Sequence, residues 1–167
     1  MKMVGIIFIV LSSTMIGLLM ASNMSGKVRR IEGLIAMLEE MASRLAHLRP
    51  TMLGLMTWLA ARERFAELGI AEVCRQRLQS GEAFSISWRA GIECESNNID
   101  RDLVDILSPL GEVLGSTDLD SQLSAISCAC RLLKVNLETA REEQRKKSGM
   151  FRTMGVLCGI AIAILLI

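Results

Sequence analysis

The stretch KVRRIEGLIAMLEEMASRLAHL, residues 27–48, decides the fold class of this chain. Its apolar residues recur at intervals of three and four, with glutamate and arginine between them. This spacing places the apolar side chains on one face of an α-helix, where they can pack against other helices. Pro50 ends the pattern because proline cannot continue a helix. The predicted apolar stripe consists of Ile31, Leu34, Ile35, Leu38, Met41, Ala42, Leu45 and Leu48.

The same periodicity recurs along the chain as far as Ala140 and predicts five more helices, the last of which outlasts its apolar stripe. They are expected over residues 51–66, 70–79, 84–94, 99–114 and 119–147. Pro109 should kink or split the fifth helix, with Ser108 as a new N-cap, and Asp118 should cap the sixth. No window of the sequence alternates polar and apolar residues as a half-buried strand does. The sequence therefore predicts an all-α domain of about six helices.

Both ends of the chain are apolar enough to span a membrane. Residues 3–24 carry no charge and, at about 1.5 Å per residue, cover about 33 Å, enough for a hydrocarbon core. Residues 150–167 carry one charge, Arg152, whose side chain can reach the lipid headgroups. We expect transmembrane helices at 3–24 and 150–167. Between them lies a helical domain at 27–148, with a charged neck at 141–148 that has no apolar face to bury.

The basic residues beside the two expected spans predict the orientation, since lysine and arginine are retained on the cytoplasmic side. Only Lys2 lies on the far side of either span, so the central domain is expected in the cytoplasm, with both termini outside. The alternative for the N-terminus is a signal peptide cleaved at Leu19-Met20-Ala21. The length of the apolar run and the basic cluster after it favour the spanning helix. The residues on the domain side are Lys27, Arg29, Arg30, Arg145, Lys146, Lys147 and Arg152.

The sequence offers little equipment for catalysis or nucleic-acid binding. Nineteen basic residues against eighteen acidic ones leave no large basic face for a phosphate backbone. The chain has one histidine, His47, no tyrosine and no glycine-rich phosphate loop. Cys128 and Cys130 should face opposite sides of a helix and make a poor metal pair. We expect no enzyme, no cofactor and no metal, and a structural role for His47.

Small residues recur every four positions in both apolar ends, which gives each expected span a flat face for close helix packing. A specific contact and the ordinary composition of spanning helices explain this pattern equally well. The residues are Ser13, Gly17 and Ala21 in the first segment and Gly155, Gly159 and Ala163 in the second.

The segment LGEVLG at 110–115, followed by Asp118 and Gln122 and by the tail GVLCG at 155–159, resembles the stage III sporulation protein AB family of endospore-forming bacteria. The resemblance runs from Gly5 near the start to the aliphatic C-terminus. It implies a membrane protein of the mother cell with a cytoplasmic domain similar to GspF-type platforms of secretion systems. It also implies work beside a secretion-type ATPase, SpoIIIAA, in an assembly that joins the mother cell to the forespore.

The residues to test first under this resemblance are Gly111, Gly115, Asp118 and Gln122. A structural role is favoured over direct partner contact, because Gly115 should end one helix, Asp118 should cap the next and Gln122 can bond across the turn. Two alternatives stay open: a two-span membrane adaptor or regulator unrelated to sporulation, and a secreted helical enzyme. Assembly into a homo-oligomer is also left open.

Overall fold

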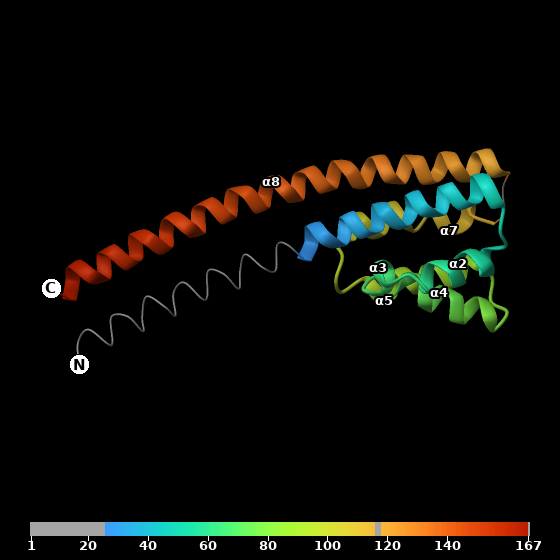
Figure 1. The fold of residues 1–167 in the computed structure, drawn as a ribbon, viewed down its shortest axis with the longest axis horizontal. Coiled ribbons are helices and arrows are strands. Elements are labelled where there is room, and N and C mark those ends of the chain that lie inside the picture. Colours follow the sequence, from blue (N-terminus) through green and yellow to red (C-terminus); the bar gives the residue numbers. More distant parts are fainter. Residues whose placement is uncertain (1–25, 116–117, 167) are drawn as a thin grey trace. The chain divides into compact units, whose positions relative to one another are not determined.

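The computed structural model describes residues 26–115 and 118–166, with side chains up to residue 146. Every regular element in this part of the chain is a helix, which confirms the predicted all-α class (Figure 1). The residues fall into two units, Arg29–Leu137 and a unit formed by the two ends of the chain. The helices are residues 26–48, α2 (Met52–Ala60), α3 (Glu63–Ala66), α4 (Ile70–Gln79), α5 (Phe84–Glu95), α6 (Arg101–Leu107), α7 (Leu110–Val113) and α8 (Leu119–Leu166).

The first helix, residues 26–48, buries most of its predicted stripe, including Leu34 and Leu38. Met37 is also fully buried, although the prediction omitted it. Leu48 contradicts the prediction, since 64% of its surface is exposed. It is the last residue of the helix, just before Arg49 turns the chain at a φ of 45°, so it lies beyond the packed turns.

Within the unit Arg29–Leu137, the first helix and the beginning of α8 lie side by side and antiparallel, and α2 to α5 form a second layer (Figure 1). The Lys134 ammonium lies 2.8 Å from the Glu39 carboxylate and ties α8 to the first helix. Arg30 reaches the buried Glu95 of α5 at 2.6 Å and joins the two layers. A buried carboxylate needs such a cationic partner, because burial alone disfavours its charged form.

The prediction of one continuous helix over 51–66 is wrong, because the chain forms two helices there, α2 and α3, with a break after Ala60. Arg62 adopts an extended conformation, with φ −93° and ψ 115°, although no glycine or proline stands nearby. In an unbroken helix, Phe65 would lie about 120° around the axis from Leu59. The break allows both side chains to be buried, so tertiary packing overrides local helix propensity here.

Pro109 splits the predicted fifth helix into α6 and α7, as expected. The predicted capping role of Ser108 is wrong. Ser108 keeps a helical backbone, and its hydroxyl donates back to the Val104 carbonyl at 2.7 Å, so Pro109 itself occupies the N-cap of α7. The hydroxyl therefore serves the end of α6 and leaves the N–H groups of α7 uncapped by a side chain.

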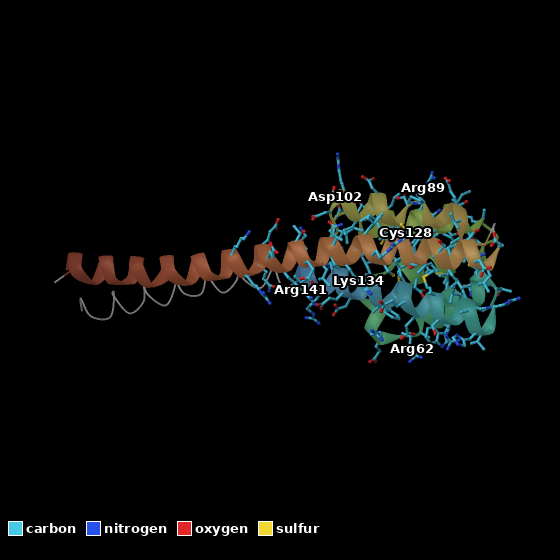
Figure 2. The ribbon with its side chains drawn as sticks, turned by 90° about the horizontal axis from the view of Figure 1, so that it is seen from above. Arg62, Arg89, Asp102, Cys128, Lys134 and Arg141 are labelled. Atoms are coloured by element: carbon cyan, nitrogen blue, oxygen red, sulfur yellow. The ribbon has the colours of Figure 1, made fainter. Side chains whose placement is uncertain are left out.

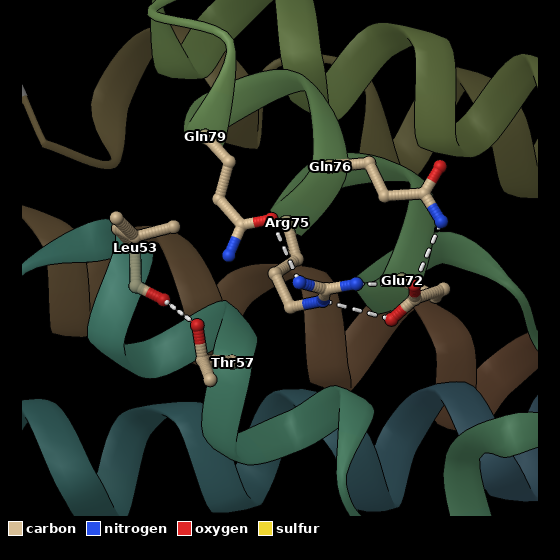
Figure 3. Close-up of polar contacts among 6 residues, drawn as sticks. All are labelled: Leu53, Thr57, Glu72, Arg75, Gln76 and Gln79. Atoms are coloured by element: carbon tan, nitrogen blue, oxygen red, sulfur yellow. Dashed lines mark hydrogen bonds and ion pairs between the residues drawn. The ribbon is translucent and has the colours of Figure 1, made fainter.

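Helix α4 carries a polar network on its surface (Figure 3). The Arg75 guanidinium donates two hydrogen bonds to the Glu72 carboxylate, at 2.6 and 2.9 Å, and one to Gln79 at 2.8 Å. The Gln76 amide donates to Glu72 at 2.7 Å. These hydrogen bonds, those of Arg75 first, lower the pKa of Glu72 to about 2.

Helix α8 continues past the predicted end at residue 147 to Leu166. In the neck, residues 141–146 are helical and exposed or half-buried, and Arg141 pairs with Glu138 at 3.0 Å. Within the described residues, no helix combines the length and the apolar character that a membrane crossing requires. The expected span at 3–24, with Ser13, Gly17 and Ala21, lies outside the described residues. So do residue 167 and the side chains of the second expected span, 150–167, among them Ala163.

Candidate functional site

The motif predicted from the sequence lies where α7 ends and α8 begins. Gly111 of α7 lies against α5, and a Cβ atom added there would come within 2.9 Å of the Trp88 ring. Trp88 is fully buried, and its indole N–H donates to the Leu107 carbonyl at 2.9 Å. Because the ring is held by this hydrogen bond, it cannot easily move aside. Gly111 thus sets the close approach of α7 to α5.

Gly115 follows α7 with a φ of 86°, a conformation that favours glycine. A Cβ atom at this position would lie 3.2 Å from the side chain of Met52 in α2. The two glycines of the motif therefore serve contacts with two different helices, α5 and α2, and do not form one common surface.

Asp118 caps α8, as the sequence predicts. The Ser121 N–H donates to the Asp118 carboxylate at 3.1 Å, and the Ser121 hydroxyl donates to it at 2.8 Å. These hydrogen bonds lower the pKa of Asp118. Gln122 lies one turn further on and is buried, with 8% of its surface exposed. Its backbone N–H donates to the Asp118 carbonyl at 3.1 Å. The structure brings Asp118 and Gln122 together in the first turn of α8, and each has a local structural role there.

A second candidate site, which the sequence analysis missed, is a cleft of about 530 Å³ between the first helix and the α2–α3 segment. We call it the Trp58 cleft. Three arginines and two glutamates line it, together with exposed and half-buried apolar groups. Its lining consists of Ala36, Glu39, Glu40, Ser43, Arg44, His47, Leu48, Trp58, Arg62 and Arg64.

Two guanidinium groups lie over the Trp58 ring in this cleft. The guanidinium carbon of Arg44 is 3.3 Å from the ring centroid, and that of Arg62 is 4.3 Å from it. A guanidinium at this distance is attracted by the ring's electron-rich face and keeps its N–H donors at the edge available for other partners. The ring thus holds two cationic groups at the cleft.

The acidic side chains of the Trp58 cleft are already neutralised. Glu40 pairs with Arg64 at 3.1 Å, and Glu39 pairs with Lys134 at 2.8 Å. Among the side chains that the structure describes, neither the Arg44 nor the Arg62 guanidinium forms an ion pair or a hydrogen bond. The cleft therefore presents an excess of positive charge, although the chain as a whole carries only +1.

His47 is exposed at the edge of the cleft, and its Nδ1 lies 2.8 Å from the Ser43 carbonyl oxygen one turn earlier. A carbonyl only accepts, so Nδ1–H donates this bond, and the ring serves the helix end as predicted. The sequence contains a partial signal for the cleft, since Glu40 and Arg44, and likewise Trp58 and Arg62, stand four residues apart. It does not contain the fact that these helix faces meet.

None of the described cysteines lines the Trp58 cleft. Cys128, labelled in Figure 2, is exposed and Cys130 is buried. The two thiols therefore face different sides of α8, as predicted. Burial raises the pKa of the Cys74 thiol to about 12. Among the described residues, no group of three His, Cys, Asp or Glu side chains gathers in a way that could hold a metal ion.

The fold and the candidate site together define a class of protein: an all-helical domain that carries a positively charged surface cleft. A family model described as stage III sporulation protein AB matches residues 2–167. The chain therefore belongs to the stage III sporulation protein AB family, as the resemblance of its motifs indicates.

The chain is similar to a known protein of this family and to a solved structure. Stage III sporulation protein AB of Bacillus subtilis (strain 168) is 22% identical over 169 residues, which cover 99% of each chain. A solved structure of stage III sporulation protein AB (SpoIIIAB) is 19% identical and has a TM-score of 0.59, and the match covers 72% of this chain and 98% of that one. The second similarity independently supports the helical fold.

Proposed function

We propose that this protein is a membrane-anchored platform of the mother cell that docks a secretion-type ATPase within the assembly linking mother cell and forespore. The observation that carries the proposal is the family match over residues 2–167, which makes it a stage III sporulation protein. The same match speaks against the alternative of an adaptor unrelated to sporulation. The GspF-like character of the domain and the identity of the ATPase as SpoIIIAA are parts of this proposal.

The distribution of chemical groups supports a role in binding rather than catalysis. The single histidine of the chain, His47, is occupied with a backbone carbonyl at a helix end. Asp118 is occupied as a helix cap. What the described surface does offer is the Trp58 cleft with its positively charged groups. Such a surface suits recognition of another protein.

We also propose that the central domain lies in the cytoplasm, with residues 3–24 and 150–167 as its two membrane anchors. The charge-free N-terminal segment and the basic residues on the domain side of both segments support this placement. Cys94 and Cys128, which are exposed, provide a test without any insertion into the chain. A membrane-impermeant maleimide should label them only after the cells are made permeable. Labelling in intact cells would refute the proposed orientation.

Docking is tested with the full chain purified in detergent or nanodiscs. The purified sporulation ATPase should form a complex that persists through size-exclusion chromatography at low ionic strength. No complex at any of several ionic strengths, with both proteins shown to be folded, would refute the platform proposal.

A further inference from the structure

The Trp58 cleft holds two cationic groups that the described chain leaves without a carboxylate. Arg44 is half-buried on the first helix, and Arg62 is the residue with extended backbone between α2 and α3. The break after Ala60, which no glycine or proline explains, places Arg62 over the same ring as Arg44. A local departure from helical geometry thus contributes to the charge arrangement of the cleft.

We propose that the Trp58 cleft is the docking site for an acidic segment of the ATPase, whose carboxylates bind Arg44 and Arg62. This inference rests on the proposed platform function and specifies its contact surface. A planar guanidinium can stack on an aromatic ring and at the same time donate two parallel hydrogen bonds to a carboxylate. Because the ring already holds both guanidinium groups, less side-chain freedom is lost when the partner binds.

The remaining lining of the cleft suits a peptide segment better than a bare anion. Leu48 stands at the cleft with 64% of its surface exposed, and Trp58 is half-buried. An apolar side chain next to the partner's carboxylates can cover both of these groups. A volume of about 530 Å³ is sufficient for several side chains of such a segment. Charged anchors around an apolar centre are the usual composition of a binding hot spot.

The ion pairs of Glu39 and Glu40 leave the cleft with a net positive charge, so it favours acidic partners. Glu39 and Glu40 are each held by a basic side chain, so they do not compete for Arg44 and Arg62. A basic partner would meet the two unpaired guanidinium groups and be repelled. The cleft therefore discriminates by charge sign as well as by shape.

The test measures the affinity of full-length protein in nanodiscs for the purified ATPase. The variant Arg44→Glu/Arg62→Glu reverses both cationic groups. The matched control Arg89→Glu/Arg101→Glu makes the same change in net charge at two exposed arginines outside the cleft. Figure 2 shows Arg89 on the opposite side of the helical unit from Arg62. We expect the cleft variant to bind at least about 30-fold more weakly and the control to bind within about threefold of the wild type.

A second variant distinguishes loss of the cationic contacts from misfolding of the domain. Arg44→Gln/Arg62→Gln removes the charges but introduces no repulsion between carboxylates within the cleft. It should weaken binding, reduce the dependence of affinity on salt concentration and leave the unfolding midpoint close to that of the wild type.

The outcomes separate this inference from the function on which it rests. If the wild type binds and both cleft variants bind equally well, the contact lies elsewhere, and the cleft assignment falls while the platform function stands. The same holds if the control variant weakens binding as much as the cleft variants do. If the wild type forms no complex, the platform function itself falls, and the cleft assignment with it.

Discussion

Replacing Gly111 with alanine should destabilise the protein, whereas the same replacement at Gly33 should stabilise it. Both glycines lie in helices, so their backbone conformations accept alanine. The difference lies in what the new methyl group meets. At Gly33 it would lie 3.6 Å from the Leu68 side chain, an ordinary contact distance. At Gly111 it would lie 2.9 Å from the Trp88 ring and 3.4 Å from the Ser85 carbonyl oxygen.

The two effects can be estimated from these distances. Alanine is favoured over glycine in a helix interior by about 1 kcal/mol, so Gly33→Ala should gain about 1 kcal/mol in the free energy of unfolding. At Gly111, overpacking against a ring fixed by a hydrogen bond should cost about 1–3 kcal/mol. The helix-propensity gain in α7, which has four residues, offsets only part of that cost. We expect Gly111→Ala to lose about 1–2 kcal/mol.

The assay is urea unfolding of the full chain in mild detergent, followed by far-ultraviolet circular dichroism. Gly33→Ala serves as the matched control, because it changes the same atoms in the same kind of element. An increase in stability for Gly111→Ala, or a shift of both variants in the same direction, would refute the idea that the contact with Trp88 fixes this position.

Three further predictions follow from the described side chains. Trp88→Phe removes the hydrogen bond to a buried carbonyl and leaves unfilled space, so the free energy of unfolding should fall by about 2–4 kcal/mol in the same urea assay. The folded-state pKa of Glu72 lies below its ordinary value, so its stabilising effect is complete above pH 4.5 and is lost as the pH falls towards about 2. The melting temperature of Glu72→Gln should therefore fall less steeply over this range than that of the wild type, and parallel curves would contradict the assignment. In the folded protein, Cys94 and Cys128 should react with a maleimide while Cys74 reacts only after unfolding, and peptide mass spectrometry distinguishes the three thiols.

Much of the fold could be predicted from the sequence because its helix boundaries are determined locally. The prediction for α4 matches the structure at both ends, since Gly69 precedes it with a φ of 65° and Ser80 and Gly81 follow it. Pro109 likewise marks a real division. The break after Ala60 could not be predicted, because it depends on tertiary packing that buries both Leu59 and Phe65 and no glycine or proline marks it in the sequence.

The candidate site shows the same division between local and distant causes. The cap formed by Asp118 and the turn at Gly115 depend on neighbours in the chain, and the sequence predicted both. The need for glycine at position 111 depends on Trp88, a residue on another helix. The Trp58 cleft depends on two helices facing each other, which periodicity does not reveal.

Among the described residues, three methionines lie buried in the core, Met37, Met41 and Met56, and they affect how this chain tolerates substitution. Thioether side chains are unbranched and adjust to the shapes around them, so an exchange between methionine and leucine costs little. A core of this kind tolerates sequence drift, which agrees with a relative that retains 22% identity over nearly the whole chain. The same sulfur atoms are a chemical weakness, because oxidation to the sulfoxide would place a polar group inside the helical bundle.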